Sequence, residues 1–543
     1  MNPSICTESS IGRKLGYSNI QYMYLRSGTK IHHPGEAPKI FEKNVSSKIK
    51  TAWELCEKNA FSQLLDKKSM LQLRATCRHL KKVYSPIVIK KEDQAAFLLE
   101  LGTRYNWDFS ALLRSKNTSD KKIFRELQNS ITSLTISFSF LIDTQKLRTI
   151  HRFFPDLTSL SIDGATLDEE ALRLITTFKK LTTFSLTNSS NRTLPPFSEH
   201  SKLEELILKG CAQLTHEGIP YLPNLKKLSI DSCPRITHLP QLDENCALEH
   251  LELSRVGIRN HETLSLLRNL RSLTIHHCLS IHGLPRLSNT VEELSLIITF
   301  SDNASLAFIR DLPQIRKLHL AGYHIPYTTL PPLQSHTKLE SLFLYGCTHI
   351  RTEDLKKIDN LPSLKELKIS YAPKIKRLPL FSKEGELKKL TLSYCDKLTN
   401  EALKPLGELS SLQELTLSSL YFTHLPLSEK NQHLHTIELI SCPLFENEGI
   451  YPLTSLPHCR HLTLRSNSHI NHLPSFPKNF PLQTVLVDYP WISLKPIENL
   501  PLLREITACK TALNALKQHP DVRYTALGHT MYIEPDIIPE DFD

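Results

Sequence analysis

The sequence has few of the features that mark an enzyme or a membrane protein. Glycine is scarce, at 16 of 543 residues. There is no phosphate-binding loop, GxSxG, HExxH or glycine-rich dinucleotide turn, so the common motifs of catalytic sites are missing. The longest apolar stretch, at residues 134–142, contains Ser and Thr and is far shorter than the ~20 residues of a membrane span. We expect no enzymatic activity, no cofactor and no membrane span.

The cysteine spacing argues against a disulfide scaffold or a zinc site. The twelve cysteines form no CxxC pair, and no histidine spacing completes a metal set. No cysteine is followed two residues later by Asp, a spacing that is the nucleophile motif of some bacterial ubiquitin ligases. The first 20 residues also lack the apolar core of a secretory signal.

The charge is positive overall and unevenly distributed. The formal net charge is +10, and residues 1–100 carry 17 basic against 9 acidic side chains. The last 13 residues carry five acids and no base. A basic head could contact nucleic acid or anionic lipid, but no aromatic–basic interleaving supports that reading. We therefore regard nucleic acid as an unlikely partner.

A repeated pattern, LxxLxL, fills most of the chain. It recurs every 21–26 residues from residue 131, in about seventeen copies that include LTSLSI at 157, LESLFL at 339 and LKELKI at 364. Alternate residues of a strand point to the same side, so the fourth and sixth positions predict one apolar face. A single such strand cannot bury that face, whereas stacked parallel strands form a continuous core.

The ninth position of the repeat is often cysteine, at Cys211, Cys233, Cys278, Cys347, Cys395 and Cys442, and it is Asn467 in one further copy. An apolar residue follows three positions later. This pattern resembles the cysteine-containing repeats of F-box/leucine-rich-repeat proteins. A free cysteine packs as a small, nearly apolar group, so we expect these six to be buried and structural.

Successive copies alternate in the segment that follows the strand. Helix-like returns such as TLDEEALRLI alternate with short Leu-Pro segments such as HLPQL and RLPLF. Proline disfavours a helix and suits an extended return. The predicted fold is an α/β repeat solenoid, a leucine-rich-repeat horseshoe. Its parallel sheet lies on the concave face, its convex segments are alternately helical and extended, and a small helical domain precedes it.

Residues 51–100 do not repeat. Their apolar residues lie at helical spacing, and the run LLDKKSMLQLRATCRHLKK resembles an F-box. The residues that match the family pattern are Leu64, Leu65, Leu71, Leu73, Cys77 and Leu80. The usual Leu-Pro opening is absent, and Leu80 stands where Trp is common. The resemblance implies docking on the adaptor of a cullin–RING ubiquitin ligase, through Leu64, Leu65, Leu71, Leu73 and Leu80. The alternative is a helical cap on the first repeat.

The predicted domains are a flexible tail at 1–50, the F-box-like segment at 51–100 and a helical cap at 101–130. Repeats in alternating pairs follow at 131–510, and a C-terminal cap with the acidic tail occupies 511–543.

A candidate partner site lies on the concave face of the predicted sheet. Ser and Thr fill most fifth positions, but three successive copies carry His319, Phe343 and Lys368 there. Large aromatic side chains lie beside them at Tyr345, Tyr371 and Tyr394. Aromatic residues with one cation are typical of binding hot spots, although such residues can also simply pack on one another.

These features indicate a protein-interaction scaffold. On one interpretation it is an F-box-like receptor that presents a target bound on the repeats to a ubiquitin ligase. On the other it is a bacterial effector or scaffold that binds a host protein without any ligase. We expect a cytoplasmic protein, which for an effector means the host cytoplasm.

Overall fold

The computed structural model describes residues 133–137, 144–164, 166–240, 242, 246–278, 281, 284–298, 306–322, 330–382, 385–467, 469–516 and 519–527. The F-box-like segment, with Leu64, Leu65, Leu71, Leu73 and Leu80, lies outside these residues, as do the predicted tail and cap at 1–130. The chain divides into two compact units. The first unit comprises the chain up to Leu214 together with Gly218–Asn224. The second unit comprises Thr215–Glu217 and the chain from Leu225 on.

The first unit contains four parallel strands. They are β1 (Ser133–Ser137), β2 (Ser159–Asp163), β3 (Thr183–Thr187) and β4 (Glu205–Lys209). Helices α8 (Thr144–Phe153) and α9 (Glu169–Ile175) follow the first two strands. Asp168 caps α9 by accepting a hydrogen bond of 2.6 Å from the Ala171 amide, as an N-cap carboxylate should.

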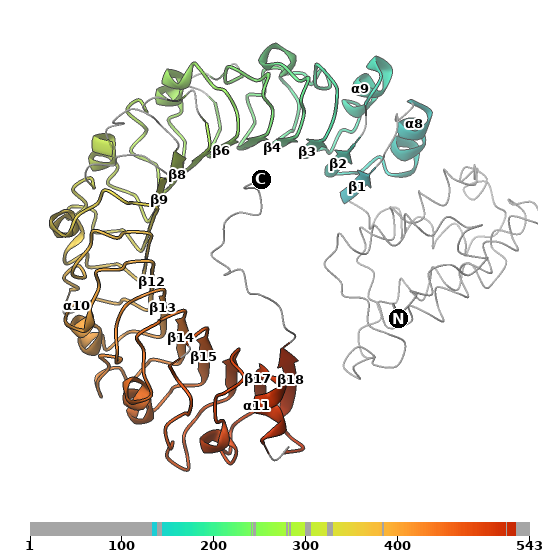
Figure 1. Ribbon diagram of the computed structural model, residues 1–543. Helices are drawn as coiled ribbons and strands as arrows, with labels where there is room; N and C mark the ends of the chain where they lie inside the picture. The colour runs from blue at the N-terminus through green and yellow to red at the C-terminus, as the bar shows by residue number, and fades with distance from the viewer. Residues whose placement is uncertain are drawn as a thin grey trace, which may run out of the picture. The chain divides into compact units, whose positions relative to one another are not determined.

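The second unit has the same architecture within itself (Figure 1). Its parallel strands are β5 (Lys227–Asp231), β6 (His250–Ser254), β7 (Ser272–His276), β8 (Glu293–Ile298), β9 (Lys317–Gly322), β10 (Ser341–Tyr345), β11 (Glu366–Ser370), β12 (Lys389–Ser393), β13 (Glu414–Ser418), β14 (Thr436–Ile440), β15 (His461–Arg465), β16 (Thr484–Val487), β17 (Glu505–Cys509) and β18 (Arg523–Leu527). Within this unit the strands line the concave side. The predicted leucine-rich-repeat solenoid is confirmed.

The core of each repeat forms as the LxxLxL pattern predicts. In β10, Leu342 and Leu344 are 0% and 1% exposed. The residues between and beside them, Ser341, Phe343 and Tyr345, are half-buried on the other face. Each strand contributes two such leucine-like side chains, and the parallel register places them beside the equivalent pair of the next strand. The sheet is therefore anchored from behind, and its front side chains are held at fixed positions.

The predicted alternation of the returns is also confirmed. A helical turn follows every second strand from β4 to β14. In chain order these turns are η1 (His216–Gly218), η2 (His261–Leu266), η3 (Leu306–Asp311), η4 (Thr352–Ile358), α10 (Asn400–Leu403) with η5 (Lys404–Glu408), and η6 (Glu448–Ser455). In the described residues, no helix follows β3, β5, β7, β9, β11, β13 or β15. Most of the helical turns are 3-10 helices, which rise more per residue than an α-helix and so cover the same return with fewer residues.

The ninth-position cysteines are buried free thiols, as expected. The Sγ atoms of Cys211, Cys278, Cys395 and Cys442 lie within hydrogen-bond reach of a carbonyl of the preceding repeat. The Cys211 thiol donates to the Leu186 carbonyl at 3.3 Å, and the Cys442 thiol donates to the Leu417 carbonyl at 3.6 Å. Asn467 makes the same bond more strongly, since its Nδ2 donates to the Leu439 carbonyl at 2.8 Å. The position therefore supplies a donor to the sixth residue of the repeat before it.

A feature absent from the predictions is the left-handed backbone at the eighth position. Twelve copies have a positive φ there: Gly164, Asn188, Gly210, Ser232, Arg255, His277, Gly346, Tyr371, Tyr394, Ser419, Ser441 and Ser466. The amide of this residue donates to a carbonyl of the next strand, as Tyr371 does to Ser393 at 3.0 Å. The extra bond continues the sheet ladder and holds the conformation even in side chains that disfavour it.

The sheet ends one strand later than the repeats indicate. β18 pairs in parallel with β17, Ile506 lying opposite Tyr524. Helix α11 (Lys510–Asn514) and the turn η7 (Lys495–Ile497) complete the C-terminal repeats. β18 reads RYTAL and lacks the leucine spacing, and three of its five residues are only half-buried.

Candidate functional site

The structure brings together the side chains predicted for the partner site. We call His319, Phe343, Tyr345, Lys368, Tyr371 and Tyr394 the aromatic patch. Phe343 of β10 lies opposite His319 of β9 and Lys368 of β11. The His319 and Phe343 rings meet edge to face, with centroids 5.7 Å apart. All six side chains are half-buried, and the five rings each contact a ring of a neighbouring repeat.

The three tyrosines form a continuous row at the carboxyl ends of β10 to β12. The Tyr345 and Tyr371 rings meet edge to face at 5.1 Å, and Tyr371 stacks on Tyr394 at 4.2 Å. The strand residues Ser370 and Ser393, which precede Tyr371 and Tyr394, are 0% and 2% exposed. A small residue there leaves room for the ring that follows it.

One polar group in this row is unsatisfied. The Ser370 hydroxyl is buried and has no hydrogen-bond partner among the described residues. Buried hydroxyls nearly always have a partner in native proteins. A buried water molecule could supply the missing bond to Ser370.

The electrostatics of the aromatic patch leave a single cation on its surface. Burial, with a smaller contribution from the charge of Lys368, lowers the pKa of His319, so its imidazole is neutral near pH 7. Lys368 forms no ion pair with any residue that the structure describes. A carboxylate brought by a partner would therefore meet an uncompensated ammonium beside aromatic rings.

A polar chain links the aromatic patch to strand β7. The Ser295 hydroxyl lies 3.2 Å from Nδ1 of His319 and 2.9 Å from Nε2 of His276. Burial and the nearby charges of His319, His277 and Arg255 lower the pKa of His276 to about 4. His276 is thus a neutral hydrogen-bonding group that fixes the His319 ring through Ser295.

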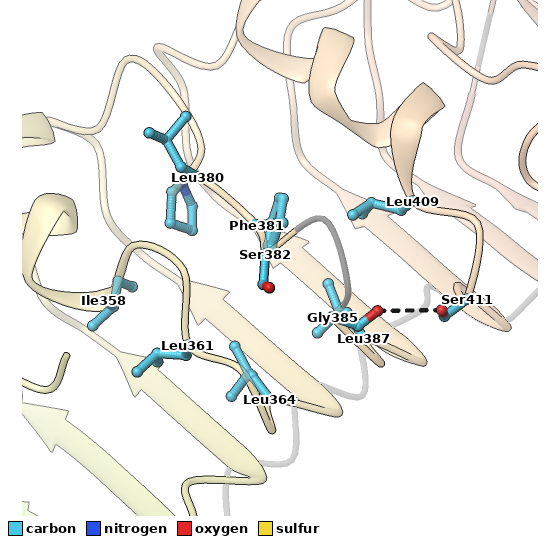
Figure 2. Close-up of a pocket in the computed structure, with 11 residues that line it drawn as sticks. Ile358, Leu361, Leu364, Leu380, Phe381, Ser382, Gly385, Leu387, Leu409 and Ser411 are labelled. Carbon is cyan, nitrogen blue, oxygen red and sulfur yellow. Dashed lines mark hydrogen bonds between the residues drawn. The ribbon is translucent and has the colours of Figure 1, made fainter. Parts of the chain in front are cut away.

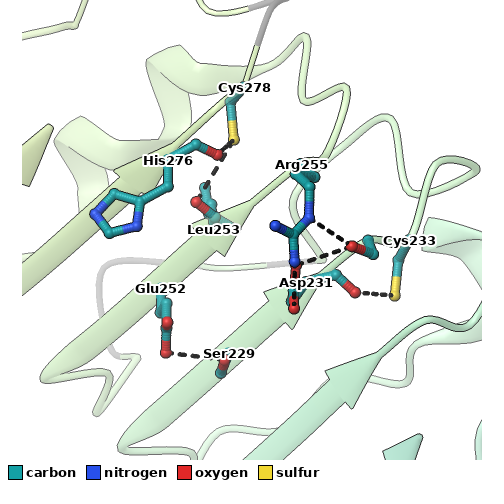
Figure 3. Close-up of polar contacts among 9 residues, drawn as sticks. Ser229, Asp231, Cys233, Glu252, Leu253, Arg255, His276 and Cys278 are labelled. Carbon is teal, nitrogen blue, oxygen red and sulfur yellow. Dashed lines mark hydrogen bonds and ion pairs between the residues drawn. The ribbon is translucent and has the colours of Figure 1, made fainter. Parts of the chain in front are cut away.

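The neighbouring strands β5 and β6 carry a closed ion pair (Figure 3). Arg255 contacts Asp231 at 2.9 Å and donates from Nε to the Ser232 hydroxyl at 2.8 Å. On the same strands Ser229 donates to Glu252 at 3.0 Å. Arg255 and Asp231 compensate each other, whereas Glu252 is exposed and forms no ion pair with a described residue, so this end of the face is polar and keeps one carboxylate charge.

The opposite edge of the sheet, where the strands begin, is a ladder of exposed ion pairs. Lys317 contacts Glu293 at 2.7 Å, and Lys389 contacts Glu414 at 3.2 Å. Exposed pairs of this kind contribute little each to stability. They do make the amino edge hydrophilic, whereas the carboxyl edge carries the tyrosine row.

A wide, solvent-open hollow of about 610 Å³ lies on the return segments after β13 and β14 and is lined by Thr423, His424, Glu446, Glu448, Gly449, Tyr451 and Pro452. A hollow on the return segments after β10 to β12 is lined mainly by apolar side chains such as Ile358, Leu361, Leu387 and Leu409, and the Ser411 hydroxyl donates to the Gly385 carbonyl beside it at 3.2 Å (Figure 2). Its volume is about 20 Å³, room for one water molecule at most. The described part of the chain also holds no cluster of three potential metal ligands, and no helix in it could span a membrane.

A second set of exposed side chains at the carboxyl edge was not predicted. Each repeat from β10 to β16 has a buried anchor after the strand, and the residue just before that anchor is exposed. We call these residues the edge column: His349, Lys374, Lys397, Tyr421, Leu444, His469 and Trp491. Trp491 is 85% exposed, and Tyr421 and Leu444 are each 48% exposed. Aligning the copies on the buried anchor, rather than on the strand alone, would have revealed this column.

Comparisons with known proteins find similar solved structures, each at a TM-score below 0.5. No protein-family model matches the chain, and no curated protein matches its sequence. A leucine-rich-repeat protein of Leptospira interrogans is 22% identical, with a TM-score of 0.48, over 72% of this chain and 98% of that one. The TLR13–ssRNA13 complex matches at 17% identity and a TM-score of 0.45, over 75% and 68% of the two chains. An internalin of Listeria monocytogenes matches at 15% identity and a TM-score of 0.31, over 75% and 89%.

Proposed function

We propose that this protein is an interaction scaffold that binds a protein partner on the concave face of its second unit. The observation that carries the proposal is the aromatic patch. Its rings lie on adjacent strands of a rigid sheet, and most other front positions in this unit are small or already paired. Aromatic side chains held in place lose little conformational entropy on binding, and a few such anchors usually dominate affinity.

The chemistry of the patch favours an extended acidic segment on the partner. Lys368 is half-buried on the front of the sheet and forms no ion pair with any described residue. Strand spacing of ~4.8 Å places the three fifth-position side chains across about 10 Å. That span fits one large anchor side chain or two to three residues of a peptide.

A capture experiment tests this function. The tagged full-length protein and its Phe343→Ala/Tyr345→Ala double variant are used as bait, and bound proteins are identified by mass spectrometry. We expect partners of the wild type to be lost from the double variant. A Thr463→Ala bait is the matched control, because Thr463 occupies the same position on β15, away from the patch. Partners retained by both variants would contradict the proposal.

We further propose that the scaffold is the substrate receptor of a cullin–RING ubiquitin ligase. Support comes from the resemblance of residues 51–100 to an F-box, through Leu64, Leu65, Leu71, Leu73 and Leu80. Leu65→Asp together with Leu73→Asp should abolish binding of the ligase adaptor while leaving partner capture unchanged. A folded wild-type protein that never binds the adaptor would instead support the alternative, an effector or scaffold with no ligase.

A further inference from the structure

The edge column changes character along the second unit. Its first three members, on β10 to β12, are His349, Lys374 and Lys397. The remaining members, on β13 to β16, are mainly apolar: Tyr421, Leu444 and Trp491, with His469 between them. The Lys374 ammonium lies 3.3 Å from Nδ1 of His349, which shows that members on adjacent strands lie side by side. Neither Lys374 nor Lys397 forms an ion pair with any described residue.

A row of exposed apolar side chains is typical of a binding surface. Tyr421 and Leu444 are equivalent positions, because the buried rings that follow them, Phe422 and Phe445, contact each other at 5.1 Å. Such a row, next to unpaired lysines and the tyrosines of the aromatic patch, is suited to an extended segment that is apolar at one end and acidic at the other.

The chain itself supplies a segment with that order. Sixteen residues, 528–543, follow β18, and their sequence is GHTMYIEPDIIPEDFD. The apolar triplet MYI comes first, and all five acids come after it. Because β18 is parallel to the other strands, the segment leaves the sheet at the carboxyl edge, where the edge column lies.

The lengths agree. At ~4.8 Å per strand, Trp491 is ~10 Å from β18, Leu444 is ~19 Å away and Lys397 is ~29 Å away. A fully extended chain covers at most ~3.3–3.6 Å per residue. Tyr532 can therefore reach ~17 Å and Asp536 ~30 Å. With the apolar triplet beside Trp491 and Leu444, Asp536 is the first acid that can reach Lys397.

We propose that residues 528–543 dock along the edge column, with their apolar side chains on Trp491, Leu444 and Tyr421 and their carboxylates on Lys397 and Lys374. Docked in this way, the acidic end lies beside Tyr371, Tyr394 and Lys368. The segment then competes with an external partner for the aromatic patch. This regulatory consequence rests on the proposed function, whereas the docking itself does not.

Zero-length carbodiimide coupling of the full-length protein tests the docking. The reagent activates a carboxylate, and a lysine amine in contact displaces it to form an amide, which peptide mass spectrometry locates. We expect acids of 536–543 to couple to Lys397 and Lys374. Lys495 is the matched control, because it is exposed and lies nearer to β18 in strand number, but it lies on the return segment η7. Coupling to Lys397 and Lys374 should exceed coupling to Lys495 severalfold and should fall at high salt.

Two results would overturn the proposal. Equal coupling to Lys495 would mean that the segment samples the surface without docking. Coupling only between isotopically distinct copies, in a mixture of labelled and unlabelled protein, would make a second molecule the occupant. No external partner enters the measurement, so a failed capture experiment leaves this result intact, and a failed coupling experiment leaves the proposed function intact.

Discussion

Tyr371 stacks on Tyr394 with ring centroids 4.2 Å apart and planes within 11°. Both residues have a left-handed backbone, with φ of 54° and 51°. Most copies of the repeat place Gly, Ser, Asn or another polar residue at this position, and a large ring there is disfavoured. Strained backbone held by its surroundings is often found at functional sites. Here the ladder hydrogen bond that most such copies make, from the Tyr371 amide to the Ser393 carbonyl and from the Tyr394 amide to the Ser418 carbonyl, holds the two rings in this conformation.

Two replacements of Tyr371 distinguish the contribution of its stacked ring from that of its left-handed backbone. Tyr371→Asn and Tyr371→Val both remove the stacked ring, but Asn tolerates the left-handed conformation and a β-branched residue does not. We expect Tyr371→Asn to be more stable than Tyr371→Val by ~1–2 kcal/mol, as measured by urea unfolding. Partner binding should weaken in both. Equal stabilities would show that the backbone at this position relaxes.

Phe343→Ala should weaken partner binding by ~1–3 kcal/mol, as is common for a central aromatic anchor. Its edge-to-face contact with His319 is also lost, which costs ~1 kcal/mol of unfolding free energy. Titration calorimetry with a captured partner gives the first quantity, and urea unfolding gives the second. Thr463→Ala should change neither. If Phe343→Ala unfolds the protein, the ring belongs to the core.

The sequence predicted the register of the patch because the leucine period fixes it. Once Leu342 and Leu344 face the core, Phe343 must face the front. The loops were less predictable. Glycine at the eighth position, as in Gly164, Gly210 and Gly346, indicates a positive φ there. Serine or tyrosine at the same position in other copies gives no such indication. β18 was missed because Tyr524 and Ala526 stand where leucine is expected, and only pairing with β17 forms the strand.

The fifth-position side chains on the concave face also differ more in their hydrogen bonding than the sequence indicates. The Thr416 hydroxyl donates to Glu438 at 3.0 Å, so it is not the neutral position that a column of Ser and Thr indicates. The composition of a column cannot reveal such a bond, because the bond depends on which residue stands on the next strand. For this reason Thr463, rather than Thr416, is used as the control.

Thiol labelling of the native protein should spare the ninth-position cysteines. Burial raises the pKa of Cys347 and of Cys395 to about 12, so almost no thiolate is present at pH 8. Cys509 is only partly buried and should react well before them. Mass spectrometry after timed alkylation resolves the sites. Rapid modification of Cys347 or Cys395 in the folded protein would contradict the assignment of these residues to the core.

Acid should weaken the second unit through His276. Its pKa in the folded protein is about 4, below the ordinary 6.5, because burial disfavours the charged ring. Between these values the unfolded chain binds a proton that the folded chain does not, so the unfolding free energy falls as the pH is lowered from about 6.5 to 4. The loss is at most about 3 kcal/mol, because the shift is ~2.5 units and the ring is only half-buried. His276→Gln cannot titrate and keeps a group that can bond to Ser295, so its urea-unfolding midpoint should depend less on pH across this window. His458→Gln, at an exposed position, is the control and should behave as the wild type. If the pH dependence of His276→Gln matches that of the wild type, His276 is not held neutral by the fold, and its link to His319 through Ser295 does not fix the patch.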